Sequence, residues 1–254
     1  MMRRSGWVAG AGLLLLAGLA LPTTNADFSS TQQVPNSFQT NDSFDRVNLR
    51  SAANFSVLGY AHVTNGGPTV LSQDIGVSPG DSIDGFPPGV IRGETHLNDQ
   101  TAITAQQDFL TAYNYVFNLP GGVGFAGDQI GATFTPGFYT TDAAFALTGT
   151  MTLDGLNEPN GYFIFRIKAA LNTAAASRIV LINGARASNV FFLSVGAAGT
   201  GANSTFVGSV LANGAVTAGA GSHITGRVLS RGLITLATNT ICDPLIIGPC
   251  PASN

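Results

Sequence analysis

The sequence has little charge, and this scarcity narrows the kinds of partner that the protein can bind. Charged residues make up 10% of its 254 residues, Lys168 is the only lysine, and the formal net charge is −3. Soluble domains typically contain about 25% charged residues. Nucleic-acid binding needs clustered Lys and Arg to neutralise phosphates, so we expect no nucleic-acid partner. The surface must consist largely of hydroxyl, amide, methyl and backbone groups.

Cysteine is equally scarce, since Cys242 and Cys250 are the only two. Two cysteines cannot form a zinc finger or a disulfide framework for the whole chain. In a secreted protein they would close a small loop around Pro244 and Pro249. We therefore predict a disulfide in a C-terminal tail at 242–254, and we expect no resident metal and no cofactor.

Long apolar runs are missing except near the start of the chain. Arg3 and Arg4 precede an apolar run at 8–21, and small residues follow at 24–26. This order is typical of a secretory signal peptide, and the run is shorter than the roughly 20 residues of a membrane span. We predict a signal peptide at 1–26, a flexible lead-in at 27–48 that is rich in Ser, Thr, Gln and Asn, and a secreted mature chain without a membrane partner. A retained N-terminal anchor is the alternative.

Glycine is abundant, and it helps to mark an internal repeat. The stretch 208–217 aligns with 226–235, and the same offset places Phe206 on Ile224 and Ser222 on Thr240. The stretch 190–196 fits this frame one repeat earlier, and 165–172 fits 192–199 after an insertion of nine residues. Residues 56–64 match 209–217 with five identities. The main offset is 18 residues. A period of this length is too short for a propeller blade and suits one coil of a solenoid.

The repeat predicts a mainly β fold, a parallel β-helix with three faces and about 18 residues per coil, over 49–241. Residues alternate between the two sides of a strand, so their direction can be assigned. We expect the inward set to be Phe206, Val210, Val216, Ile224, Val228 and Ile234, and the outward set to be Ala215, Thr217, Leu233 and Thr235. Because coils are spaced by about 4.8 Å, outward residues should form straight columns.

One segment, at about 98–118, has helical rather than β periodicity. Asn98 is the predicted N-cap, apolar residues then recur at helical spacing from Ala102 to Val116, and Pro120 marks the end. An amphipathic helix of this length cannot fit inside a coil. We predict that it lies along one side of the solenoid and covers Leu211 and Leu229, which point outward although they are apolar.

Several motifs together resemble a known family. They are Thr64-Asn65-Gly66-Gly67-Pro68-Thr69, Asp74-Ile75-Gly76-Val77-Ser78-Pro79-Gly80, Gly85-Phe86-Pro87-Pro88-Gly89, His96-Leu97-Asn98-Asp99, Thr135-Pro136-Gly137-Phe138-Tyr139 and Val180-Leu181-Ile182-Asn183-Gly184-Ala185. In combination they resemble the microbial ice-binding protein family of discontinuous right-handed β-solenoids with a long flanking helix, so the resemblance implies a right-handed parallel β-helix. The resemblance covers about 48–241. It implies a role in cold adaptation, through adsorption to ice with thermal hysteresis and inhibition of recrystallisation. It also implies that the first and last coils are neighbours in space.

An ice-binding face should be flat, rigid and poor in charge. Threonine offers a hydroxyl and a methyl group on a stiff β-branched side chain, and Ala and Gly keep the surface level. The outward columns that follow the glycine turn meet this description: His62, Thr64, Ala170, Asn172, Ala197, Gly199, Ala215, Thr217, Leu233 and Thr235. His62 and Leu233 interrupt the columns, so we expect moderate activity. The rival face carries Thr205, Val207, His223 and Thr225.

Two other functions fit a secreted solenoid less well. A carbohydrate-active β-helix enzyme needs clustered acidic residues, whereas the aspartates of this chain are scattered beside Gly and Pro turns that explain them. A calcium site formed by Asp74, Asp81 and Asp84 is a minor alternative. A cell-envelope adhesin that binds glycan or another protein is the other candidate. Separately, the sequons at Asn41, Asn54 and Asn203 would accept glycans if the source is eukaryotic. We expect a monomeric ice-binding protein that is not an enzyme.

Overall fold

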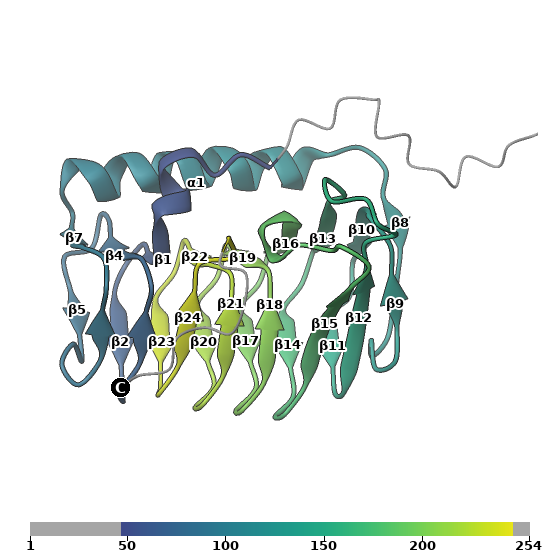
Figure 1. Ribbon diagram of the computed structural model, residues 1–254. Helices are drawn as coiled ribbons and strands as arrows, with labels where there is room; N and C mark the ends of the chain where they lie inside the picture. Colours follow the sequence, from purple (N-terminus) through teal and green to yellow (C-terminus); the bar gives the residue numbers. More distant parts are fainter. Residues whose placement is uncertain (1–46, 246–254) are drawn as a thin grey trace, which may run out of the picture. The chain divides into compact units, whose positions relative to one another are not determined.

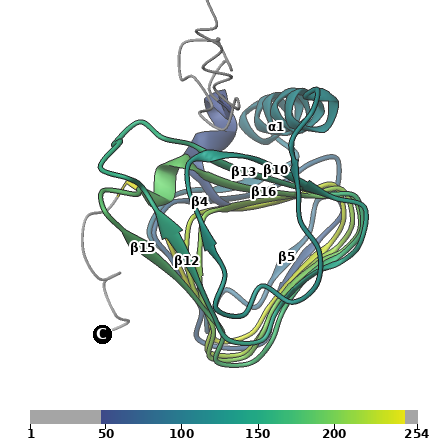
Figure 2. The ribbon, with the colours of Figure 1, turned by 90° about the vertical axis from the view of Figure 1, so that its right-hand side faces the viewer.

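The computed structural model describes residues 47–245, which form a solenoid of stacked coils. The predicted signal peptide and nearly all of the predicted lead-in lie outside the described residues. Each coil passes through three parallel sheets, which we call sheets A, B and C, and the coils have a triangular cross-section (Figure 2). The predicted parallel β-solenoid with three faces is confirmed.

The three sheets run along the length of the solenoid (Figure 1). Sheet A contains, in order, β7 (Thr95–Leu97), β4 (Asp74–Val77), β1 (Phe55–Gly59), β22 (Val228–Ser230), β19 (Ser209–Ala212), β16 (Val190–Ser194), β13 (Phe163–Ile167), β10 (Gly137–Thr141) and β8 (Val123–Gly124). Sheet B contains β11 (Phe145–Leu147), β14 (Leu171–Thr173), β17 (Ala198–Thr200), β20 (Val216–Ala218), β23 (Ile234–Leu236), β2 (Val63–Asn65) and β5 (Ile83–Asp84). Sheet C contains β6 (Val90–Ile91), β3 (Val70–Leu71), β24 (Thr240–Cys242), β21 (His223–Thr225), β18 (Thr205–Val207), β15 (Arg178–Ile182), β12 (Thr150–Asp154) and β9 (Thr133–Phe134).

The order of strands shows that the chain returns on itself. β1 pairs with β22, β2 with β23 and β3 with β24, so the first coil lies directly on the last one. The chain then winds away to β7, and a long helix carries it back to β8 at the opposite end of the solenoid (Figure 1). The expected contact between the first and last coils is therefore confirmed, and it explains why their sequences match in one frame.

The predicted repeat gives the correct strand register for most, but not all, of the alignment. Phe206 pairs with Ile224, and Phe192 with Val210, as the repeat requires. The insertion of nine residues lies at the end of the coil that contains β15, where a 3-10 turn, η2 (Ala187–Asn189), precedes β16. The placement of Ser222 on Thr240 was wrong, because Thr240 pairs with His223. The turn before β24 is one residue shorter than the turn before β21, and Thr238 adopts a left-handed conformation (φ 57°) there.

Inward side chains of all three sheets fill the solenoid with one hydrophobic core. The six residues predicted to point inward are all buried in it. A stack of aromatic rings runs along the axis beneath sheet A, with Phe165 at 4.6 Å from Phe192 and at 5.3 Å from Tyr139 between ring centroids. Such stacks add to the burial energy and hold successive coils in register.

The long helix α1 (Gln100–Asn118) lies over sheet A (Figures 1 and 2). Asp99 is its N-cap and accepts a hydrogen bond of 2.9 Å from the backbone N–H of Ala102. The predicted N-cap, Asn98, was one residue early, because Asn98 adopts a left-handed conformation (φ 48°) before the helix begins. The helix and the outer side of sheet A share a second buried cluster, which contains Phe109, Tyr113, Val116, Ile164, Phe191, Leu193, Leu211 and Leu229. The prediction that the helix covers Leu211 and Leu229 is confirmed.

The N-terminal end of the described chain packs beside this helix. Val47 and Leu49 are buried in the second cluster, and the 3-10 helix η1 (Arg50–Asn54) follows. The hydroxyl of Ser51 donates a hydrogen bond of 2.6 Å to the carboxylate of Asp108 on α1. Sheet A is thus covered over much of its outer surface, and sheets B and C remain to face the solvent.

Glycines and small polar residues shape the corners between the sheets. Gly226 and Gly208 have φ angles of 159° and 123°, and a Cβ on Gly226 would lie 1.9 Å from the carbonyl oxygen of Gly208. Only glycine fits this stacked corner between sheets C and A. At the corner between sheets B and C, Asn239 donates to the Ser222 hydroxyl at 2.8 Å, and its own backbone N–H donates to Thr69 at 2.9 Å. These contacts fix the edge of sheet B.

Candidate functional site

The outward residues of sheet B form two straight columns. In the first column, Asn172 pairs with Gly199, which pairs with Thr217, then Thr235 and Thr64. The residue two positions before each of these five faces the same way, which gives a second column of Ala170, Ala197, Ala215, Leu233 and His62. The structure thus brings all ten predicted site residues together, the first column within the strands of sheet B in the predicted register and the second at the residues directly before these strands.

The character of these columns is neutral and mostly small. Asn172, Ala197, Thr217 and Leu233 are exposed, and the other six are half-buried between their neighbours. The hydroxyl of Thr64 lies 3.5 Å from that of Thr235, across the junction of the first and last coils. Leu233 is the largest apolar side chain in the columns, with 47% of its surface exposed. Seen along the axis, most coils overlie one another closely on the side away from β12 and β15, where sheet B lies (Figure 2).

Sheet B contains two further strands that the sequence did not assign to the face, β11 and β5. Ala146 of β11 pairs with Asn172, and Ala144 therefore extends the alanine column. The repeat missed β11 because the coil that joins β11 to β14 is longer than the repeating unit. The small residues Ala143-Ala144 before a buried Phe145 were the only available signal.

Charged residues lie where the columns end and along the edge next to sheet A. Asp84 of β5 pairs with Thr64, and its carboxylate lies 2.7 Å from the ring nitrogen Nε2 of His62. At the other end, Asp128 forms a bridge to Ala146. Along the edge next to sheet A, Lys168 forms an ion pair of 2.7 Å with Asp142. The interior of the face between these groups carries no charge.

Sheet C, the rival face, is less regular. Arg178 stands in the same column as Thr150, Thr205, His223 and Thr240, so a permanent charge interrupts it. In the next column Val207 is buried, whereas Val180 and Thr225 reach the solvent. The loop 155–162 and the segment with η2 project from the corner that joins this sheet to sheet A (Figure 2). Sheet C therefore offers a smaller continuous plane than sheet B.

The acidic residues considered for calcium do not converge on a site. Asp74 accepts a backbone hydrogen bond of 2.8 Å from Glu94, and its other oxygen lies 3.8 Å from His96 on the side of sheet A. Asp84 contacts His62 on sheet B. Within residues 47–245, no group of three or more His, Cys, Asp or Glu side chains is arranged to hold a metal ion.

The carboxylates with shifted pKa values serve local structure. The pKa of Asp99 is lowered chiefly by the hydrogen bond from the backbone N–H of Ala102, and the pKa of Asp128 chiefly by the hydrogen bond from the Thr148 hydroxyl. In Asp108, burial alone would raise the pKa, but hydrogen bonds from Ser51 and Arg50 outweigh it and lower the pKa. Asp99 therefore caps α1 and Asp128 holds a turn, as aspartates beside turns are expected to do, whereas Asp108 joins α1 to η1.

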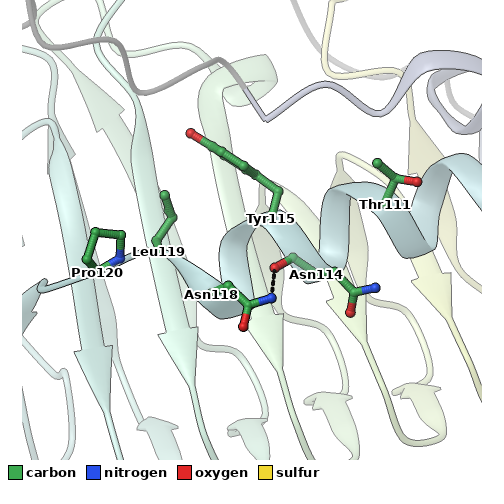
Figure 3. A pocket seen from close by; sticks show the side chains of 6 residues that line it. All are labelled: Thr111, Asn114, Tyr115, Asn118, Leu119 and Pro120. Atoms are coloured by element: carbon green, nitrogen blue, oxygen red, sulfur yellow. Dashed lines mark hydrogen bonds between the residues drawn. The ribbon is translucent and has the colours of Figure 1, made fainter.

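A shallow hollow lies beside the C-terminal turns of α1, on the side of sheet A (Figure 3). Thr111, Asn114, Tyr115, Asn118, Leu119 and Pro120 line it. The side-chain amide of Asn118 donates to the carbonyl oxygen of Asn114 at 2.8 Å, one turn earlier in the helix. This lining carries no charged group, and the hollow is remote from the columns of sheet B.

Cys242 is disulfide-bonded, and Cys250, the other cysteine of the chain, lies outside the described residues. Cys242 belongs to β24 rather than to the tail, so the last strand ends one residue later than predicted. Within the described residues, no helix combines the length and the apolar character that a membrane span requires.

Comparisons with known proteins agree with this architecture. The ice-binding protein of Nostoc sp. (strain HG1) is 43% identical over 178 residues, which cover 69% of this chain and 66% of that protein, slightly under two thirds of its length. The ice-binding protein of Flavobacterium frigoris (strain PS1) is 29% identical over 206 residues, which cover 74% of this chain and 73% of that protein.

A solved structure gives the same result. The crystal structure of the ice-binding protein from the Antarctic ascomycete Antarctomyces psychrotrophicus superposes with a TM-score of 0.75 and 37% identity, and it covers 77% of this chain and 97% of its own. The family model described as ice-binding-like matches residues 57–242, which include every strand of the solenoid except part of β1. The chain therefore belongs to the ice-binding-like family.

Proposed function

We propose that this protein adsorbs to ice through sheet B, and that adsorption causes thermal hysteresis and inhibits recrystallisation. The observation that carries the proposal is the register of sheet B, which places Asn172, Gly199, Thr217, Thr235 and Thr64 in one column. The family and its ice-binding relatives support it.

The geometry suits a solid made of ordered water. Strands about 4.8 Å apart repeat the same hydroxyl, amide or methyl group along the axis, and the two outward columns are spaced by two residues along each strand. Threonine and alanine side chains lose little freedom when they contact a surface, because threonine has a restricted χ1 and alanine has no rotamers. Many weak contacts over a rigid plane can then add together without a large entropic cost.

The direct test is to grow an ice hemisphere in a solution of the fluorescently labelled protein. We expect the label to enter the ice on particular planes. Exclusion of the label from the ice, with the protein folded by circular dichroism, would overturn the proposal. The interruptions at His62 and Leu233 predict moderate activity. Hyperactive thermal hysteresis at low protein concentration would contradict this prediction of moderate activity.

A matched pair of variants tests the choice of face. Thr217→Tyr places a large ring in the middle of sheet B, whereas Thr225→Tyr places the same ring on sheet C. Thr217→Tyr should abolish thermal hysteresis, because the ring holds the plane away from the ice, and Thr225→Tyr should retain it. Both should keep the circular dichroism spectrum of the unmodified protein. The opposite result would assign the function to sheet C.

We further propose that the protein is exported and acts as a monomer. The charged, apolar and small residues of 1–26 support export, and the disulfide at Cys242 fits an oxidising compartment. N-terminal sequencing of the mature protein should find a start near Asp27, and a start at Met1 would contradict cleavage. Sedimentation should give the mass of one chain.

A further inference from the structure

The first outward column of sheet B has the same residue type at both ends. Asp128 pairs with Ala146 at one end, and Asp84 pairs with Thr64 at the other. Between them stand six neutral residues in register: Ala146, Asn172, Gly199, Thr217, Thr235 and Thr64. A neutral array is therefore bounded by a carboxylate on each side.

Asp84 is placed so that its charge faces solvent at the level of the column. Its side chain is 67% exposed, and its Oδ2 atom lies 2.7 Å from Nε2 of His62 and 3.2 Å from the donating hydroxyl of Ser82. These partners stand in the neighbouring column, since His62 precedes Val63 and Ser82 precedes Ile83 in the paired strands. None of these contacts caps a backbone group, so the fold does not need a carboxylate at this position.

Asp128 is held more firmly at the opposite end. It accepts hydrogen bonds from the backbone N–H groups of Thr148 at 3.0 Å and Ile130 at 3.2 Å, and from the Thr148 hydroxyl. The hydrogen bond from that hydroxyl is the main reason that the pKa of Asp128 is lowered. The carboxylate therefore stays ionised in mildly acidic as well as neutral solution.

A carboxylate keeps a strong hydration shell that an ordered surface of neutral water molecules cannot replace. Ice that covers Thr64 or Ala146 would have to remove water from the carboxylate at the next position in the column, Asp84 or Asp128. We propose that Asp84 and Asp128 delimit the ice-binding face and restrict adsorption to the six neutral strands between them. This inference rests on the proposed function of sheet B, and it assigns to these residues the role of limiting how far the ice-binding face extends.

The chain itself indicates how the face can be lengthened. In Asp84→Thr, the new residue continues the first column, as Thr64 and Thr235 do further along. Asp128→Asn removes the other charge but keeps an oxygen to accept the two backbone hydrogen bonds. Glu158→Gln, on the exposed loop 155–162 away from sheet B, is the control for a change in net charge.

The experiment measures thermal hysteresis at equal concentrations, together with incorporation of labelled protein into an ice hemisphere. We expect higher hysteresis for Asp84→Thr and for Asp128→Asn, the highest when they are combined, and no change for Glu158→Gln. If the unmodified protein enters ice but the face variants do not exceed it, the inference is overturned and the proposed function stands. An equal rise in Glu158→Gln would also overturn it, because net charge would be the cause. If the unmodified protein is excluded from ice, the proposed function itself fails.

Discussion

Arg166 fastens the C-terminal end of α1 to the solenoid, and its removal should have a large, local effect on stability. Its guanidinium donates to the carbonyl oxygens of Leu119 at 2.6 Å, Phe117 at 3.0 Å and Gly121 at 3.1 Å. It also lies 4.7 Å from the centroid of the Phe138 ring. The end of a helix leaves carbonyl groups without partners, and this one side chain satisfies three carbonyls in and just after the last turn.

The magnitude of the effect follows from these contacts. A hydrogen bond from a charged donor stabilises a fold by about 1.5–3 kcal/mol. Only 8% of Arg166 is exposed, so the cost of desolvating the guanidinium offsets part of the gain from the three bonds. We expect Arg166→Met, which keeps most of the apolar stem, to lower the free energy of unfolding by about 3–4 kcal/mol.

Urea denaturation followed by circular dichroism measures this change, and hydrogen exchange locates it. Amides near Phe117 and Leu119 should exchange faster in Arg166→Met, whereas amides of sheet B should not. The control is Arg178→Met, in which an exposed arginine on sheet C is replaced and a change of less than about 0.5 kcal/mol is expected. A loss of less than about 1 kcal/mol in Arg166→Met, or a loss equal to the control, would refute the assigned role.

Three further predictions concern stability. Asp99→Ala should cost about 1 kcal/mol in urea denaturation, because it removes the N-cap of α1; no loss would contradict the assignment of the cap. Phe165→Ala should cost about 3–5 kcal/mol, since it leaves a cavity in the aromatic stack; a cost below about 1 kcal/mol would mean that the stack repacks. The free energy of unfolding should fall as the pH drops below the ordinary aspartate pKa of 3.8, because Asp99 and Asp108 have lowered pKa values in the fold and the unfolded chain binds protons first. Asp108→Asn should flatten this dependence in acid titrations, and an unchanged slope would show that Asp108 contributes little.

The predicted positions of the outward residues were accurate where the repeat is regular. Between β16, β19 and β22, and between β17, β20 and β23, the offset from strand to strand is constant, and there the alignment gave each outward residue of sheet B its correct neighbour. A regular repeat places residues reliably because identical coils must stack with the strand spacing and cannot slip by one residue without exposing the core. The repeat alone was therefore enough to place Ala215 and Thr217 in their columns.

The prediction missed the two strands at the ends of sheet B, β11 and β5. The coil before β14 and the coil after β2 are both longer than the repeating unit, and this hid Ala146 and Asp84, which continue the same column. An insertion at a corner lengthens a coil but leaves its strands stacked on those of the next coil. Strands that are neighbours in the sheet then no longer align at the offset of the repeat. The partners of Arg166 were also inaccessible, because carbonyl groups at the end of a helix have no signature in the side-chain pattern.

The junction of the first and last coils has a consequence for how the protein acquires activity. Thr64 and Thr235 are 171 residues apart in the chain, yet they are adjacent on the face, and Ile234 donates its backbone N–H to His62 at 2.9 Å. Contacts of such sequence separation close slowly, since a long loop must be ordered before they form. During synthesis β1, β2 and β3 leave the ribosome first, and one edge of each strand stays unpaired. These edges can pair only when β22 to β24 emerge. A chain that ends before the last coil would hold two separate half-surfaces, so the continuous plane exists only in the finished protein.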